Sequence, residues 1–110
     1  MKILHIIPSL YRGGAERLAL DICIEMQHRN ECEVRLLTFR NDNTYPLLSK
    51  LIRWDVVPSK VELSLLKINK TGIAQLEDYL NKFNPDIIHS HLFEAELVSR
   101  CVDYSKAKWF

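Results

Sequence analysis

Short apolar runs alternate along this chain with longer stretches of helical periodicity, and this alternation limits the folds open to it. Five runs are brief and rich in β-branched or aromatic residues, which favours buried strands. They are residues 2–7, 33–39, 55–58, 86–91 and 106–110. Four stretches repeat apolar side chains every three or four positions, which predicts helices. They are residues 15–29, 46–54, 71–83 and 92–104, and the remaining residues 59–70 are predicted to be a connection.

Strands that alternate with helices predict a three-layer α/β/α fold, in which helices cover both faces of a parallel sheet. In the usual doubly wound order the first and fourth strands are central neighbours, and the chain leaves them toward opposite sides of the sheet. A crevice then opens beyond the carboxyl ends of these two strands. The loops at that crevice, residues 8–14 and 90–94, hold a glycine pair and a histidine pair.

The glycine pair, Gly13 and Gly14, lies between the first strand and the first helix. Paired glycines permit backbone angles that other residues avoid, and free N–H groups at a helix start favour an anion. A tight turn that binds nothing is an equally good interpretation. The dinucleotide fingerprint GxGxxG and the phosphate loop ending in Gly-Lys-Ser/Thr are both absent. Glu16, in the first helical turn, complements the helix dipole but would repel a close phosphate.

The histidine pair, His89 and His91, alternates along the fourth strand, so both side chains point to one face if the strand continues through them. His91, where the strand ends, is better placed for a substrate hydroxyl or phosphate. His89, and still more His5 within the first strand, are expected to be packed and hydrogen-bonded. No third ligand is near in sequence, so no metal site is predicted. Asp86 is expected to anchor its strand by a hydrogen bond, and Ser90 to pack against a helix.

Composition excludes several classes of protein. The chain has 15 Lys+Arg and 14 Asp+Glu, a net charge of +1, whereas nucleic-acid binding needs clustered cations, so no nucleic-acid partner is expected. No apolar run approaches the roughly 20 residues of a membrane-spanning helix, and the opening run is too short for an export signal. The three cysteines form no CxxC pair, so we expect reduced thiols in a cytoplasmic protein. Cys23 and Cys101 are expected to pack as small apolar side chains.

Residues 50–70 carry more basic than acidic side chains, beside a few apolar ones. The basic residues are Lys50, Arg53, Lys60, Lys67 and Lys70, the acidic ones Asp55 and Glu62, and the apolar ones Leu47, Leu51 and Trp54. Two interpretations are open. One is a peripheral contact with an anionic membrane surface, and the other, which we favour, is a helix packed on the sheet with a solvated outer face.

Two motifs carry a resemblance to a known family. Residues 1–10 followed by Gly-Gly-Ala-Glu at 13–16, and Asn-Pro-Asp-Ile-Ile-His-Ser-His at 84–91, resemble the amino-terminal lobe of retaining glycosyltransferases of the glycogen-synthase-like superfamily, often labelled group 1 or family 4. The resemblance covers nearly the whole chain. Together the two motifs are fairly specific to the family, but they say little about the sugar.

The resemblance implies a Rossmann-like lobe of the two-domain GT-B architecture. Such enzymes move a sugar from a nucleotide-sugar donor to an acceptor hydroxyl with retention, without an obligatory metal or other cofactor. It implies that Gly13 and Gly14 approach the donor diphosphate, and that Arg12, His91 and Glu94 line the acceptor side. The implied partners are a nucleotide sugar and a glycan or lipid-linked acceptor, in cell-surface glycan or polysaccharide synthesis. The implied location is the cytoplasm, with a peripheral contact to the inner face of the membrane as an open alternative.

The chain also departs from the family pattern. The family's catalytic-side histidine follows the fifth strand, and its carboxy-terminal lobe holds the nucleotide; neither lies within these 110 residues. We therefore expect residues 1–110 to be an incomplete amino-terminal lobe, truncated near the fifth strand, with no catalytic residue of its own and no activity alone. An unpaired sheet edge would favour a homodimer. The alternative is a flavodoxin-like binding or docking module without catalysis.

Overall fold

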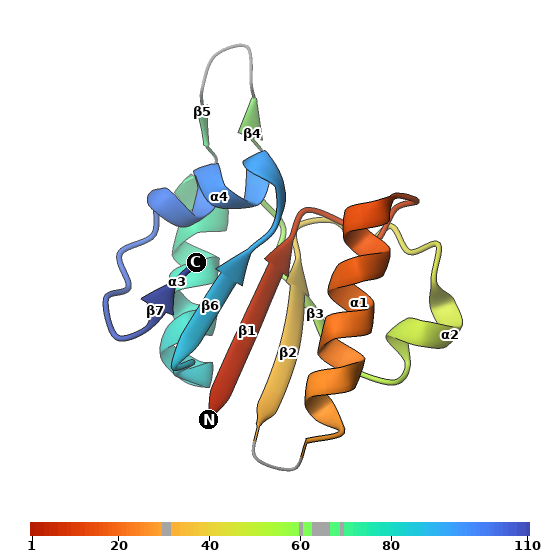
Figure 1. Ribbon diagram of the computed structural model, residues 1–110. Coiled ribbons are helices and arrows are strands. Elements are labelled where there is room, and N and C mark those ends of the chain that lie inside the picture. The colour runs from red at the N-terminus through yellow and green to blue at the C-terminus, as the bar shows by residue number, and fades with distance from the viewer. Residues whose placement is uncertain (30–31, 60, 63–66, 69) are drawn as a thin grey trace.

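Five parallel strands form the central sheet of the protein. The computed structural model describes residues 1–29, 32–59, 61–62, 67–68 and 70–110, and the sheet order is β3-β2-β1-β6-β7 (Figure 1). The strands are β1 (Lys2–Ile7), β2 (Glu33–Thr38), β3 (Arg53–Val56), β6 (Ile87–Ser90) and β7 (Lys108–Trp109). The helices are α1 (Gly14–Gln27), α2 (Pro46–Ser49), α3 (Lys70–Phe83) and α4 (Leu92–Arg100). A separate antiparallel hairpin joins β4 (Val61–Glu62) to β5 (Lys67–Ile68).

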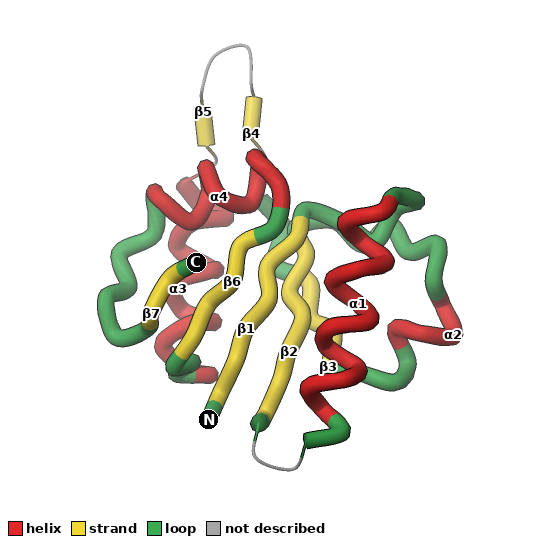
Figure 2. Tube along the Cα trace, in the orientation of Figure 1, coloured by secondary structure: helices red, strands yellow, loops and turns green. Residues whose placement is uncertain are grey.

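Helices cover both faces of this sheet, which confirms the predicted three-layer α/β class. Figures 1 and 2 show α1 on one face and α3 on the other. On the α1 face, alternate residues of β1 and β2 pack with the helix into one apolar cluster, which includes Ile3, Ile7, Leu20, Cys23 and Leu36. On the opposite face, the intervening strand residues pack with α3 and α4 into a second cluster, which includes Leu4, Ile6, Leu76, Ile88 and Val98. The alternation follows from the two-residue period of a strand.

The order of the central strands also agrees with the sequence expectation. Strand β1 pairs in parallel with β2 on one side and with β6 on the other. The first and fourth predicted strands are therefore neighbours, and the chain connections leave them in opposite directions. Their register places His5 directly opposite His89. Asp86 accepts a hydrogen bond from the backbone N–H of Lys2 (N···O 2.8 Å), and the hydroxyls of Ser90 and Ser99 lie 2.7 Å apart, so both expected roles are confirmed.

The second helix is the clearest error of the sequence prediction. The expected helix at residues 46–54 ends at Ser49, and Arg53 and Trp54 belong to β3 instead. Trp54 pairs in register with Leu36, and its indole N–H donates to the Thr38 hydroxyl (2.9 Å). Sheet pairing and a buried indole partner therefore override the helical spacing of the leucines. The expected packed helix is therefore only four residues long, and Arg53 and Lys70 lie on β3 and α3 instead of on one helix with Lys50. Lys60 lies outside the described residues.

Smaller differences concern the carboxy-terminal third. Helix α4 ends at Arg100 rather than at residue 104, because Tyr104 is buried and its hydroxyl donates to the Asn84 side chain (3.0 Å). Cys23 is buried as expected, but Cys101 is exposed at the end of α4, so its expected packing role is wrong. Among the described residues, no helix combines the length and apolar content needed to span a bilayer.

Candidate functional site

The loops that leave β1 and β6 meet at the carboxyl edge of the sheet, as the doubly wound topology predicts. The backbone N–H of His91 donates to the Ile6 carbonyl (2.8 Å), which joins the start of α4 to the end of β1. The Pro8 carbonyl accepts from the N–H groups of Phe39 and Arg40 (3.0 and 3.1 Å), which ties the glycine loop to the end of β2. The edge is therefore built from three adjacent strands, and it lies at the point where the strand order reverses.

The glycines do not adopt the unusual backbone angles that the sequence suggested. Gly13 is extended, with φ 171° and ψ 162°, and no glycine in the described part of the chain lies in the left-handed region. The space beside the two residues differs. A side chain at Gly13 would collide with the carboxylate of Glu16, whereas a Cβ at Gly14 would enter open space. The Tyr45 hydroxyl accepts from the Gly13 N–H (3.4 Å) and donates to the Gly13 carbonyl (3.2 Å).

The start of α1 combines a favourable and an unfavourable feature for an anion. Gly13 has no side chain to cap the helix, and the first helical hydrogen bond runs from the Arg17 N–H to the Gly13 carbonyl (3.3 Å). Helix N–H groups that precede this bond are donors toward the crevice. The Glu16 carboxylate lies beside them. An anion bound here must therefore displace the Glu16 carboxylate. The helix dipole stabilises a negative charge at this position, whether it is the carboxylate or the bound anion.

Of the three residues expected on the acceptor side, Arg12 is exposed beside the glycines and His91 is half-buried at the edge. Glu94 is already paired. Both of its carboxylate oxygens accept from the guanidinium of Arg40, at 2.8 and 3.1 Å. Sequence reasoning missed Arg40, although its position directly after the second strand was the available signal. This ion pair joins the segment after β2 to the first turn of α4 at the carboxyl edge of the sheet. A ligand bound there meets a guanidinium–carboxylate pair and not a free carboxylate.

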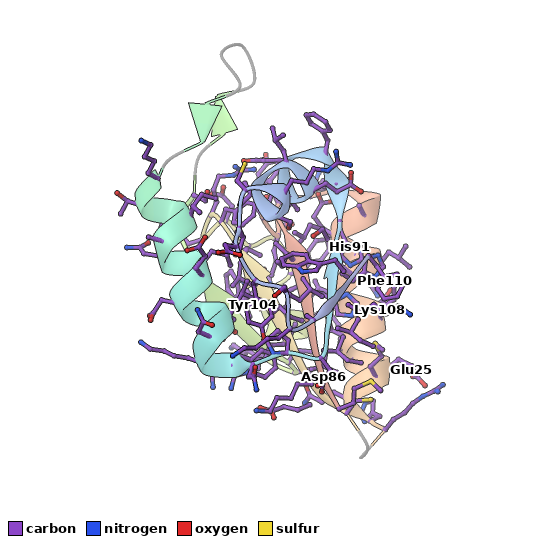
Figure 3. The ribbon with its side chains drawn as sticks, turned by 90° about the vertical axis from the view of Figure 1, so that its left-hand side faces the viewer. Glu25, Asp86, His91, Tyr104, Lys108 and Phe110 are labelled. Atoms are coloured by element: carbon purple, nitrogen blue, oxygen red, sulfur yellow. The ribbon has the colours of Figure 1, made fainter. Side chains whose placement is uncertain are left out.

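Three histidines gather beside this edge, which we call the histidine cluster: His5, His89 and His91. The rings of His89 and His91 are stacked with centroids 4.1 Å apart, and the ring of His5 lies 5.4 and 5.2 Å from them. The Nδ1 atom of His5 and the Nε2 atom of His91 are hydrogen-bonded at 2.9 Å. His5 is only 2% exposed, whereas His89 and His91 are half-buried. Figure 3 shows His91 on the same side of the sheet as Phe110 and Lys108.

Two members of the cluster, His5 and His91, are neutral at neutral pH. Burial, followed by the nearby imidazoles of His91 and His89, lowers the pKa of His5 to about 4. Burial and the nearby His89 lower the pKa of His91 to about 4. Each neutral imidazole offers one N–H donor and one lone pair. The rings are therefore suited to accept a hydroxyl proton or to ligate a cation, and unsuited to pair with a phosphate.

The residue after His91 has a strained backbone. Leu92 begins α4 with a φ of 72°, in the left-handed region that leucine rarely adopts. Its side chain is 45% exposed, and that of the neighbouring Phe93 is 62% exposed. Strain of this kind persists where the surrounding structure holds it, and it concentrates at binding sites. The preceding residue is held in place by the hydrogen bond from the His91 N–H to the Ile6 carbonyl.

A hollow of about 280 Å³ lies elsewhere, between α4 and the end of β7. It is lined by Ser90, Glu96, Ser99, Arg100, Val102, Trp109 and Phe110. None of the residues that the sequence proposed for a site lines it. We therefore place the candidate site at the carboxyl edge between β1 and β6, where the topology, the open helix start and the histidine cluster coincide.

Comparison with solved structures shows a structural likeness. No protein-family model and no curated protein sequence matches the chain. A solved structure, a glycosyltransferase from Rickettsia africae ESF-5, superposes on 98% of this chain with a TM-score of 0.68 and 18% sequence identity. This chain spans 28% of the length of that protein. The likeness confirms the Rossmann-like α/β fold, and the chain has the fold of one part of a glycosyltransferase.

Proposed function

We propose that the chain is the acceptor-side lobe of a GT-B glycosyltransferase, which moves a sugar from a nucleotide-sugar donor to an acceptor hydroxyl. One observation carries the proposal. The loop with Gly13 and Gly14 and the loop with His91 flank the reversal of strand order between β1 and β6. Ligands of open α/β sheets bind at such a reversal. The fold shared with a solved glycosyltransferase supports the same assignment.

The glycine loop is proposed to face the donor diphosphate. Bond cleavage in the donor places negative charge on the departing diphosphate, and fixed N–H dipoles stabilise such charge as an oxyanion hole does. A Cβ placed on Gly14 would have no neighbour within 4 Å, so the backbone there is open to close approach. Glu16 has to leave the helix start when the diphosphate arrives, because two anions cannot share it.

The acceptor is proposed to lie over His91, with Arg12 and the Arg40–Glu94 pair at its rim. A neutral His91 binds an uncharged sugar hydroxyl by one hydrogen bond, and its other nitrogen is held by His5. The carboxylate of Glu94, oriented by Arg40, offers further lone pairs to hydroxyl groups. A polyol with several hydroxyl groups fits this mixture of donors and acceptors.

The finer features of the proposal follow the family that the motifs resemble. We propose transfer of a hexose with retained configuration, no obligatory metal in the transfer, and a cytoplasmic role in cell-surface glycan or polysaccharide synthesis. A second lobe would supply the cationic groups that hold the nucleotide. This chain alone is then expected to bind donor and acceptor weakly and to be catalytically inactive.

The test is a titration of the ¹⁵N-labelled chain with a panel of nucleotide sugars and oligosaccharides, followed by backbone NMR. Nucleotide sugars should shift the amide signals of Gly13 and Gly14, and acceptors those of His91 and Glu94. Gly14→Val should weaken the donor response at least tenfold, because the new side chain occupies the open space. Ala74→Val, at an exposed position of α3, is the matched control and should not. Shifts confined to the hollow beside Trp109, or no response to any nucleotide sugar, would favour a docking module instead.

A further inference from the structure

We propose that His5, His89 and His91 form a binding site for one divalent transition-metal ion, with Zn²⁺ as the test case. The proposal does not rest on glycosyl transfer and concerns only the three side chains. The sequence suggested no metal site because no third ligand lies near His89 and His91 in the chain. The third ligand comes from β1, since the parallel register places His5 opposite His89.

The spacing of the three rings is close to that of a metal site. One nitrogen from each histidine lies within 4.8 Å of the nitrogens of the other two. Two nitrogens that bind zinc at about 2.0–2.1 Å lie about 3–3.5 Å apart. The His5 Nδ1 and His91 Nε2 atoms, at 2.9 Å, are already at the short end of that range. The remaining gap closes if the stacked rings of His89 and His91 turn toward His5.

The two histidines that must rotate are partly accessible to solvent, whereas the third is buried. His5 is 2% exposed within the central strand, so it provides a fixed ligand. His91 is half-buried on the face that also carries Phe110 and Lys108 (Figure 3), and His89, whose ring stacks on that of His91, is half-buried as well. An ion can therefore reach the cluster from the solvent side, and water or a ligand can fill a fourth position. Three protein ligands with one open position is the arrangement of catalytic zinc sites.

The chemistry of the donors selects the kind of ion. Neutral imidazole nitrogen suits zinc, copper and nickel, whereas magnesium and calcium prefer oxygen. Within the part of the chain that the structure describes, the only groups of three or more possible ligand residues gathered this closely are these histidines. The ion would replace the hydrogen bond between His5 and His91. The ring that donates this bond would change tautomer, so that its single proton moves to its other nitrogen.

The affinity should be moderate. Ligating histidines are usually oriented by an acceptor on their second nitrogen. The Nε2 atom of His5 is buried and has no hydrogen-bond partner among the described residues. We therefore expect a dissociation constant in the micromolar range rather than the much tighter binding of a structural zinc site.

Isothermal titration calorimetry with Zn²⁺ tests the proposal on tag-free protein. We expect one ion per chain, and a rise of several degrees in the midpoint of thermal unfolding that EDTA reverses. His89→Gln and His91→Gln should each weaken binding at least tenfold, and the double variant should abolish it. Both positions are half-buried, so we expect these variants to fold. Circular dichroism checks that they do. His28→Gln is the matched control, because His28 is exposed at the far end of α1.

Other outcomes overturn the proposal. Absence of binding to the folded chain removes it directly. Binding that survives the double His89→Gln, His91→Gln substitution places the ion elsewhere. Cys101 is the exposed thiol, so loss of binding in Cys101→Ser alone would assign the ion to that residue. Weakening by His28→Gln equal to that by His91→Gln would show adsorption to single surface histidines.

Discussion

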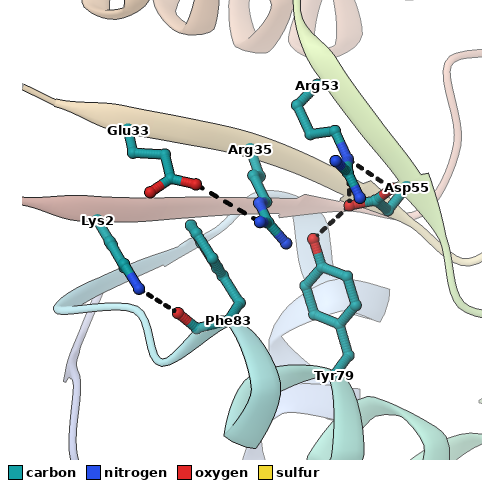
Figure 4. A network of polar contacts seen from close by, with 7 residues as sticks. All are labelled: Lys2, Glu33, Arg35, Arg53, Asp55, Tyr79 and Phe83. Carbon is teal, nitrogen blue, oxygen red and sulfur yellow. Dashed lines mark hydrogen bonds and ion pairs between the residues drawn. The ribbon is translucent and has the colours of Figure 1, made fainter. Parts of the chain in front are cut away.

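Two clusters of polar side chains lie on opposite faces of the same sheet, and they are built on different principles. On the α3 face, Asp55 accepts from the hydroxyl of Tyr79 (2.6 Å) and from the guanidinium of Arg53 (3.0 Å), and Arg35 lies over the Phe83 ring at 4.0 Å (Figure 4). A carboxylate pairs with a guanidinium, and a second guanidinium lies over an aromatic ring. On the α1 face, the histidine cluster brings together three like groups.

The difference indicates that the Asp55 network stabilises the fold, whereas the histidine cluster is available to bind a ligand. Complementary groups satisfy one another, so the network around Asp55 needs nothing further. Like groups satisfy one another poorly, and the orphaned Nε2 atom of His5 shows it. Buried polar groups without partners cost stability, and a ligand that supplies the missing partner is one explanation for them. The following variants separate the two roles, beginning with the largest effect.

Removal of the Tyr79 ring should cost the most. Tyr79 packs against Phe83 with ring centroids 6.3 Å apart and hydrogen-bonds Asp55. Tyr79→Ala should lower the free energy of unfolding by about 3–4 kcal/mol, and Tyr79→Phe, which removes only the hydroxyl, by about 1 kcal/mol. Urea denaturation measures both. Equal losses in the two variants would assign the stabilisation to the hydroxyl instead of the packed ring.

Low pH should destabilise the fold through the histidine cluster. The folded pKa values of His5 and His91, about 4, lie below the ordinary value of 6.5, so the unfolded chain binds more protons between those pH values. Stability is therefore full above about pH 6.5 and falls as the pH approaches 4. His5, which is almost fully buried, should contribute a loss on the order of 2–3 kcal/mol between pH 7 and 4.5.

Urea denaturation at a series of pH values, with EDTA present, measures this slope. His5→Leu should flatten it, whereas Tyr79→Phe should leave it unchanged. A slope that persists in His5→Leu would mean that groups outside the cluster govern the acid response.

The sequence predicted the parts of this comparison that depend on periodicity, and missed those that depend on register. Helix α1, helix α3 and the order of β1 and β6 follow from apolar spacing and chain topology. The leucines of residues 46–52 keep a helical spacing past Ser49, so only the pairing of Trp54 with Leu36 reveals that β3 begins at Arg53. Local spacing carries no information about such a pairing.

The candidate site was predictable in position and less so in composition. Topology located the glycine loop and His91 at one edge. The Arg40–Glu94 pair joins residues 54 positions apart, and His5 joins His91 across 86. Each contact depends on which strands are adjacent and how they are aligned, so the pattern of neighbouring residues along the chain does not reveal it. The closeness of the Glu16 carboxylate to Gly13 likewise depends on a side-chain position.

Replacement of Arg35 should have a moderate effect on the network. Its guanidinium lies over the Phe83 ring and 3.5 Å from the Glu33 carboxylate. Arg35→Met keeps the apolar stem and removes the charge, so it should lower the free energy of unfolding by about 1–2 kcal/mol. Arg35→Lys should recover less than half of that loss, because an ammonium does not stack on a ring as a guanidinium does. Full recovery would mean that charge alone matters. Thermal unfolding compares the three proteins.

The smallest expected effect has the opposite sign and contrasts two left-handed residues. Asn84 (φ 59°) ends α3, where its N–H donates to the Leu80 carbonyl (2.7 Å) and its side chain accepts from Tyr104. Leu92 (φ 72°) stands at the candidate site with an exposed side chain. Asn84→Gly should lower the free energy of unfolding by about 0.5–1 kcal/mol through the lost hydrogen bond. Leu92→Gly should raise it by about 0.5–1 kcal/mol, because glycine adopts a positive φ without strain.

Urea denaturation of both glycine variants measures the contrast, and Leu92→Ala provides its control. Alanine shortens the side chain but keeps the strain, so it should not stabilise the protein. Strain that raises stability when it is released must be maintained for some other reason. At Leu92 that reason is the position of His91, whose N–H is held by β1. If Leu92→Gly stabilises the fold and also weakens binding at His91, the turn is kept strained to position the histidine. If Leu92→Gly destabilises the chain, the leucine side chain contributes more packing than its exposure indicates, and the site edge is structural like the network on the opposite face.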